Sequence, residues 1–197
     1  MSSNLVSPLR LVVLISGNGS NLQAIIDEIN SNNLPAEIVA VISNKADAYG
    51  LERAKKANIP QHFLSHLDYD DRKQYDLALQ SLIDQFKPDL IILAGFMRIL
   101  SDEFVEHYSH KMMNIHPSLL PKYKGLNTHQ RVLDAGENEH GCSVHFVTAA
   151  LDDGPVILQA TVAVNENDNA ETLAVKVHKQ EHRIYPQAIR MFAENKI

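Results

Sequence analysis

The sequence alternates short, unbroken apolar runs with segments of helical periodicity through its first hundred residues. Three of the runs, Leu11–Ile15, Ile38–Ile42 and Leu90–Ala94, contain apolar side chains at every position. A strand that is apolar throughout has both faces buried, which is typical of a parallel sheet covered by helices on both sides. Strands that alternate with helices build such a sheet. The pattern predicts an α/β fold with a doubly wound, mostly parallel twisted sheet.

Segments with helical spacing or turn residues separate and follow these strands. The expected helices are Asn21–Ile29, Tyr49–Ala57, Asp70–Phe86, a helix capped by Ser101, Thr128–Ala135 and a C-terminal helix at Ala170–Glu194. Pro186 is expected to interrupt the last of them. Ile59–Phe63 is a short expected strand. Ser143–Thr148 and Val156–Val164 flank a turn-rich segment, which predicts an antiparallel edge strand.

Composition limits the classes of partner. The chain has 197 residues, is 45% hydrophobic and carries a formal net charge of −6, which suits one domain at residues 10–197 after a loose tail at 1–9. An acidic protein without a basic block is a poor match for nucleic acid, and no apolar run is long enough for a membrane span. The tail lacks the pattern of a secretory signal. We therefore expect small-molecule partners and a cytoplasmic location.

An amide and an imidazole are paired at the end of a further apolar run, in Met113–Pro121. Residues i and i+2 of a strand point to the same side, so Asn114 and His116 are expected to share one face. Pro117 would end the strand directly after them. Such a pair can stabilise the oxyanion of a tetrahedral intermediate. The alternative is a histidine that only satisfies its hydrogen bonds at a strand end.

The segment Ser16–Asn21 joins the first expected strand to the first helix and contains two glycines. Glycines let the backbone approach a ligand, and the free N–H groups of a helix start attract anions. The alternative is an ordinary tight turn capped by Ser20 or Asn21. Leu22 replaces the third glycine of the dinucleotide fingerprint, and no Gly-Lys-Ser/Thr motif occurs, so a monophosphate is favoured over a nucleotide cofactor.

Two segments could complete a site around His116. Asp152–Pro155 is a turn, and from the residues alone either Asp152 or Asp153 could face the imidazole. Gly95–Leu100 follows a buried strand, and its apolar side chains either belong to the core or form a wall for a flat ring.

Two apparent metal or thiol sites have simpler interpretations. His178 and His182 lie four residues apart on the expected C-terminal helix, a spacing that suits metal ligation, but no third ligand is evident and a polar helical face explains them. Glu181 could bind an amine or a hydroxyl of a substrate. Cys142 is the only cysteine, which excludes a disulfide within the chain, and its strand-like surroundings indicate a buried apolar role rather than a reactive thiol.

Six segments spread along the chain form one combined pattern. They are Ile15–Asn21, Ser43–Ala46, Ala94–Leu100, Asn114–Pro121, Leu151–Ile157 and Gln180–His182. Together they resemble the phosphoribosylglycinamide formyltransferases, folate-dependent enzymes of purine synthesis. The resemblance extends from Leu11 to Phe192. The late segments resemble formyl-handling folate enzymes in general, and the glycine loop resembles the glycinamide ribonucleotide branch.

The resemblance implies formyl transfer from 10-formyltetrahydrofolate, as co-substrate, to the amine of 5'-phosphoribosylglycinamide, without a metal. It implies a catalytic trio of Asn114, His116 and Asp152, which selects Asp152 over Asp153. The ribonucleotide would contact Gly19, Ser20, Asn21, His178, Lys179, Gln180 and Glu181. The folate pocket would comprise Arg72, Met97, Arg98, Ile99, Leu100, Asn114, Thr148, Ala149, Ala150, Leu151 and Asp152. Residues 10–110 would form a phosphate-binding half and residues 111–197 a catalytic and folate-binding half, in a monomer or a homodimer.

Two residues depart from the family pattern. Asn127 stands where similar enzymes often carry histidine, and Lys124 replaces a common proline. The nearest rival function is that of another formyl-folate enzyme. A deformylase would carry a further domain before the first strand, and a transfer-RNA formyltransferase would carry a nucleic-acid-binding domain. A rival of another class, a non-catalytic nucleotide-binding module, has no need for the pairing of Asn114 with His116.

Overall fold

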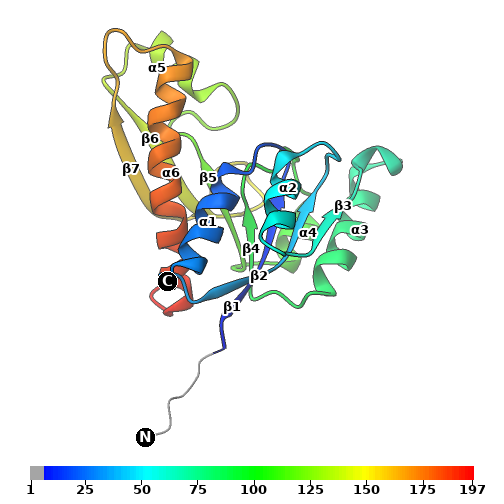
Figure 1. The fold of residues 1–197 in the computed structure, drawn as a ribbon. Coiled ribbons are helices and arrows are strands. Elements are labelled where there is room, and N and C mark those ends of the chain that lie inside the picture. Colours follow the sequence, from blue (N-terminus) through cyan, green and yellow to red (C-terminus); the bar gives the residue numbers. More distant parts are fainter. Residues whose placement is uncertain (1–6) are drawn as a thin grey trace, which may run out of the picture.

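The computed structural model describes residues 7–197, in which seven strands form one sheet covered by helices (Figure 1). The strands are β1 (Leu9–Ile15), β2 (Ala36–Ser43), β3 (Gln61–Phe63), β4 (Leu90–Leu93), β5 (Met112–His116), β6 (Glu139–Phe146) and β7 (Val156–Ala163). The helices are α1 (Ser20–Asn30), α2 (Tyr49–Lys56), α3 (Arg72–Asp84), α4 (Asp102–His107), α5 (Thr128–Asp134) and α6 (Ala170–Ala193). Residues 1–6 of the expected tail lie outside the described residues, and β1 already begins at Leu9.

The strand order is β3-β2-β1-β4-β5-β6-β7. The strands from β3 to β5 are parallel, whereas β6 runs antiparallel to both β5 and β7. The predicted mostly parallel sheet with an antiparallel edge is therefore confirmed. The strands β1, β4 and β5 are neighbours, so the loops that follow them lie at the same edge of the sheet. Ligands of open parallel sheets bind at this edge, near the point where the strand order reverses.

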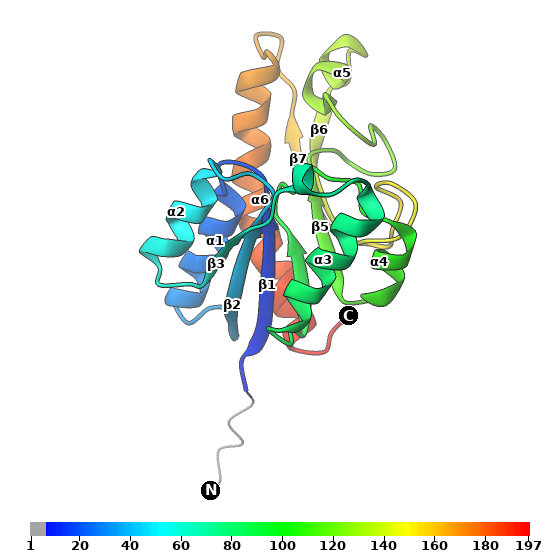
Figure 2. The same ribbon diagram turned by 90° about the vertical axis from the view of Figure 1, so that its right-hand side faces the viewer.

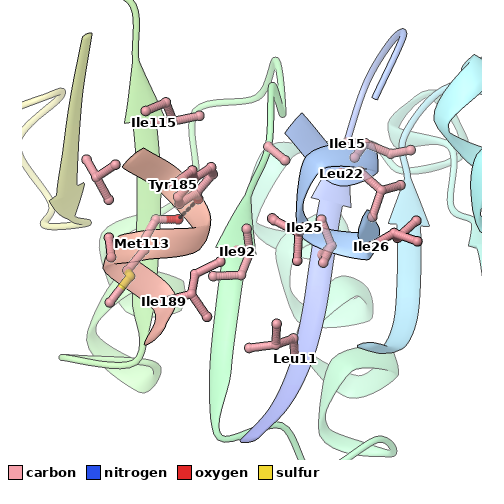
Figure 3. Packing of buried hydrophobic residues seen from close by; sticks show 14 of the residues in the cluster. Leu11, Ile15, Leu22, Ile25, Ile26, Ile92, Met113, Ile115, Tyr185 and Ile189 are labelled. Atoms are coloured by element: carbon pink, nitrogen blue, oxygen red, sulfur yellow. Dashed lines mark hydrogen bonds between the residues drawn. The ribbon is translucent and has the colours of Figure 1, made fainter. Parts of the chain in front are cut away.

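Alternate residues of β1 belong to two separate hydrophobic layers. Leu11, Val13 and Ile15 pack with α1, α2 and α6, as Figure 3 shows for the first and last of these residues. Val12 and Leu14 pack with α3 and α4, which cover the opposite face (Figure 2). This burial on both faces explains the unbroken apolar run. Cys142 is fully buried in the first layer, and burial raises the pKa of its thiol to about 12.

The expected interruption of α6 at Pro186 is wrong, because the helix is continuous from Ala170 to Ala193. A proline inside a helix removes one backbone hydrogen bond and costs about 3 kcal/mol. Here the helix is held by its buried face, which includes Ile184. Figure 3 shows Tyr185 and Ile189 of this face against the sheet. The Tyr185 hydroxyl lies 2.9 Å from the carbonyl oxygens of two strands, β4 and β5. Like the other helices within residues 7–197, α6 lacks an apolar stretch long enough to cross a membrane.

Candidate active site

The site begins at the carboxyl end of β5, where the strand presents its two polar side chains to one side. Met113 and Ile115 point into the layer covered by α1 and α6. Because side chains alternate along a strand, Asn114 and His116 point to the opposite face. His116 is 6% exposed, so this imidazole is buried at the strand end.

The connection between β6 and β7 folds back across this face and brings a carboxylate to the imidazole. The Oδ2 atom of Asp152 lies 3.4 Å from Nδ1 of His116, and both side chains are 8% exposed. The same oxygen accepts a hydrogen bond of 2.9 Å from the backbone N–H of Gly125. Asp153, in contrast, is exposed and pairs with Lys124. The structure therefore places Asp152, and not its neighbour, beside His116.

The second ring nitrogen of His116 also faces an acceptor, because Nε2 lies 3.0 Å from the carbonyl oxygen of Tyr123. An imidazole with hydrogens on both nitrogens can donate to this carbonyl and to the carboxylate of Asp152 at once. The loop that supplies the carbonyl is anchored to β6, because the buried hydroxyl of Ser143 donates a 2.6 Å hydrogen bond to the carbonyl of Ser118. The ring is thus held on both sides by backbone-anchored groups.

His145 is a member of the site that sequence reasoning missed. It is the register partner of Asn114 on β6, and its Nε2 lies 3.2 Å from Nδ2 of the amide. Its Nδ1 lies 2.8 Å from the carbonyl of Phe146, which requires a hydrogen on Nδ1. Burial lowers the pKa of His145, so Nε2 is free to accept from the amide. This fixes the Nδ2 end of Asn114 and leaves its second hydrogen available to a ligand.

A cavity opens in front of Asn114 and Asp152. The expected folate residues that line it are Arg98, Ile99, Leu100, Asn114, Thr148, Ala149, Ala150, Leu151 and Asp152. The additional lining residues are Leu93, Phe96, Val105, His145 and Val147. Two expected residues do not line it: Met97 is 64% exposed, and Arg72 lies exposed at the start of α3. The cavity has an apolar wall and a polar end, which is the usual form of a small-molecule site.

The wall that follows β4 is tied to neighbouring elements through backbone groups. The hydroxyl of Ser16, at the end of β1, accepts a 2.8 Å hydrogen bond from the N–H of Met97. The buried carboxylate of Asp76, on α3, accepts a 2.6 Å hydrogen bond from the N–H of Ser101. Polar contacts at both ends keep this segment in place, so the wall is a preformed part of the cavity.

The glycine loop after β1 leaves the start of α1 without a side-chain cap. Gly19 occupies the N-cap position with φ = 73°, and no side chain accepts a hydrogen bond from the first turn. The alternative interpretation, in which Ser20 or Asn21 caps the helix, is therefore wrong. The amide of Asn21 instead donates a 2.8 Å hydrogen bond to Glu181, which is buried. The uncapped N–H groups are suited to an anion.

Of the α6 residues expected at the ribonucleotide, Glu181 is the one that contacts the loop. His178 lies parallel to His182 with ring centroids 6.4 Å apart. Lys179 is exposed, and Gln180 accepts a 3.1 Å hydrogen bond from Arg183. Within residues 7–197, no three His, Cys, Asp or Glu side chains are grouped so that they could hold a metal ion.

The two departures from the family pattern lie in the loop beside the trio. Asn127 precedes α5 with φ = 57°, a left-handed conformation that asparagine adopts more readily than most residues. Lys124 forms an ion pair with Asp153, and its carbonyl accepts a 2.7 Å hydrogen bond from Arg131. Asn127 therefore provides the left-handed backbone before α5, and Lys124 links the loop to Asp153 and Arg131.

Comparison with known proteins places this geometry in a family. Residues 9–189 match the family model described as formyl transferase. The chain is 54% identical to phosphoribosylglycinamide formyltransferase of Escherichia coli K12 over 96% of its own length and 89% of that protein. A phosphoribosylglycinamide formyltransferase of Coxiella burnetii superimposes with a TM-score of 0.92 at 57% identity, covering 95% of this chain and 88% of the other. A glycinamide ribonucleotide transformylase of Symbiobacterium toebii superimposes with a TM-score of 0.96 at 43% identity, covering 99% and 92%. The chain belongs to the formyl transferase family.

Proposed function

We propose that the protein transfers the formyl group of 10-formyltetrahydrofolate to the amine of 5'-phosphoribosylglycinamide, giving formylglycinamide ribonucleotide and tetrahydrofolate in purine biosynthesis. One observation carries the proposal. The imidazole of His116 lies 3.4 Å from the carboxylate of Asp152, and Asp152 lines a cavity together with Asn114. The relatives named above bear the name of this activity.

The chemistry requires stabilisation of negative charge and movement of one proton. The amine of the ribonucleotide attacks the formyl carbon, the bond from this carbon to the folate nitrogen breaks, and one proton passes from the attacking to the leaving nitrogen. The free hydrogen of the Asn114 amide and the Nε2–H of His116 are the donors for the transient oxyanion, which would take the place of the Tyr123 carbonyl on Nε2. Asp152 balances the positive charge of the imidazole and accepts a proton from the attacking nitrogen through water.

The glycine loop and α6 are suited to the two ends of the ribonucleotide. Uncapped N–H groups after Gly19, with Ser20 and Asn21, would bind the phosphate. The buried carboxylate of Glu181, which already accepts from Asn21, would bind a ribose hydroxyl. His178, Lys179 and Gln180 flank Glu181 along α6 and would complete the ribonucleotide site.

The cavity next to the trio suits the folate. The side chains of Ile99, Leu100 and Leu151 offer apolar contact to a flat ring system, and Arg98 offers positive charge. Arg72 and the exposed Met97 lie outside the cavity lining and would act only at the distal part of the co-substrate. The proposed chemistry uses no metal.

The division into two halves is also a proposal. Residues 10–110 carry the phosphate-binding loop, and residues 111–197 carry the trio. Each half contributes to both ligands, since Arg98 belongs to the first half and Glu181 to the second. The proposed site is built within one chain, which suits a monomer or a homodimer. Its partners are small molecules, and a folate-dependent step of purine synthesis suits the cytoplasm.

The test is an acceptor-dependent assay. Purified protein is mixed with 10-formyltetrahydrofolate, and tetrahydrofolate formation is followed by absorbance with and without phosphoribosylglycinamide. The proposal expects turnover only with the ribonucleotide, with one formylated product per folate. Formate release without the acceptor would indicate a deformylase instead, and no turnover with either would indicate a binding module.

A further inference from the structure

We propose that Arg53 is a positioning residue for the phosphate-binding loop. Its hydrogen bonds to Asn18 orient the loop so that the N–H groups after Gly19 point at the ribonucleotide phosphate. Arg53 lies on α2 and is remote in sequence from the loop. The inference rests on the proposed function, because it assigns a role to Arg53 only through the loop that this function uses.

The guanidinium of Arg53 donates hydrogen bonds from two of its nitrogens to the loop. Its Nε donates a 2.8 Å hydrogen bond to the carbonyl oxygen of Asn18, and its Nη2 donates a 2.9 Å hydrogen bond to Oδ1 of the same residue. Its Nη1 lies 3.2 Å from the side-chain oxygen of Gln23 in the first turns of α1. One planar group therefore fixes both the loop and the helix that follows it. A rigid fork of this kind is specific to arginine.

The position of Arg53 is itself fixed by the start of α2. Its guanidinium carbon lies 4.8 Å from the ring centroid of Tyr49, within the range of cation–π contact. The N–H of Gly50 donates a 3.0 Å hydrogen bond to the carbonyl of Gly17. A Cβ atom built on Gly19 would lie 2.7 Å from Cα of Gly50. The loop is thus packed directly against α2, so a change on this helix is transmitted to the loop backbone.

Among residues 7–197, Arg53 forms no ion pair with a carboxylate. It lines an open cavity together with Ser20 and His182, and with the carboxylates of Asp27 and Glu28. Burial lowers the pKa of His182, the charge of Glu181 opposes this shift, and the charges of His178 and Arg53 add to it. Arg53 could therefore act on a phosphate through orientation of the loop or through its charge alone, and the two roles can be separated by substitution.

The test uses Arg53→Met, which removes both fork and charge, and Arg53→Lys, which keeps the charge but cannot bridge the same atoms. We expect both variants to raise the KM for the ribonucleotide by about tenfold to a hundredfold, the usual effect of losing hydrogen bonds to a charged group. The kcat and the KM for the folate should not change. Lys56→Gln is the matched control, because Lys56 lies on the same helix near the same Tyr49 ring and its substitution removes the same charge. It should leave all constants unchanged.

Four results would overturn the proposal. Recovery of the wild-type KM in Arg53→Lys would indicate that charge, not orientation, is what matters. An equal change in the KM values for the ribonucleotide and the folate would indicate a general structural role. A lower melting temperature with an unchanged ratio of these two KM values would indicate the same. Calorimetric titration with the ribonucleotide alone measures the same effect without turnover. Unaltered affinity in an Arg53→Met protein that still forms product would remove the role of Arg53 and leave the proposed function standing.

Discussion

The proposed mechanism depends on the contact between the imidazole of His116 and the carboxylate of Asp152, which lie 3.4 Å apart. His116→Ala and Asp152→Asn are each expected to lower kcat by about a hundredfold to a thousandfold, the usual cost of one oxyanion donor or of a proton-transfer group. Asp153→Asn is the control, because Asp153 is exposed and pairs with Lys124. Steady-state assays and thermal unfolding separate catalytic loss from misfolding. Near-normal turnover in a folded His116→Ala protein would remove the mechanism.

A second residue-scale prediction concerns Gly19. Its positive φ costs a non-glycine residue about 1–2 kcal/mol, and its Cβ would lie 2.7 Å from Cα of Gly50. Gly19→Ala is therefore expected to raise the KM for the ribonucleotide, with little change for the folate. Gly136→Ala is the control, since Gly136 also has a positive φ but a Cβ atom added to it would have no neighbour within 4 Å. If the folate KM rises instead, the phosphate assignment is wrong.

At the scale of secondary structure, α6 begins with a reciprocal cap. The side chain of Asn169 accepts hydrogen bonds from the N–H groups of Glu171 and Thr172, both at 2.9 Å, and the Thr172 hydroxyl accepts from the N–H of Asn169. Asn169→Ala is expected to lower the free energy of unfolding by about 1 kcal/mol. Asn169→Asp, which keeps the acceptor, should lose less. Urea unfolding measures both, and equal losses would contradict a role of the cap.

Most elements were predictable from periodicity, and the errors have physical causes. The strand β6 begins at Glu139, four residues before the expected start at Ser143. In the structure Gly141 lies inside the strand, where a Cβ would come within 2.0 Å of the Ala160 carbonyl on β7. The glycine therefore marks the close approach of a neighbouring strand. This cause, like the burial that keeps α6 continuous through Pro186, depends on tertiary contacts that a local pattern does not contain.

At the scale of the whole molecule, the sequence could predict which edge of the sheet carries the site but not every side chain that meets there. The Asn114–His116 pair ends one strand and the glycine loop follows another, so their common edge follows from the fold class. His145 was missed because it reaches Asn114 through the register of β5 with β6, which periodicity does not set. From the residues alone, the choice between Asp152 and Asp153 needed the path of a loop across the sheet, although the family resemblance already selected Asp152. Pairing register and loop path therefore limit the prediction of a site.

The last prediction concerns acid stability, which depends on a buried histidine outside the trio. His140 is 1% exposed and its Nε2 lies 2.9 Å from Nδ1 of His129, and burial, with a smaller contribution from the charge of His129, lowers its pKa to about 4. Between pH 6.5, the ordinary pKa of histidine, and pH 4, the unfolded chain takes up a proton at His140 that the folded protein does not. The free energy of unfolding is therefore highest above pH 6.5 and decreases as the pH falls toward 4. The loss from this group is about 3 kcal/mol. Urea unfolding over this range should show a shallower loss for His140→Gln than for the wild type, with the exposed His110→Gln unchanged from wild type. Parallel losses in all three proteins would show that His140 is not the cause.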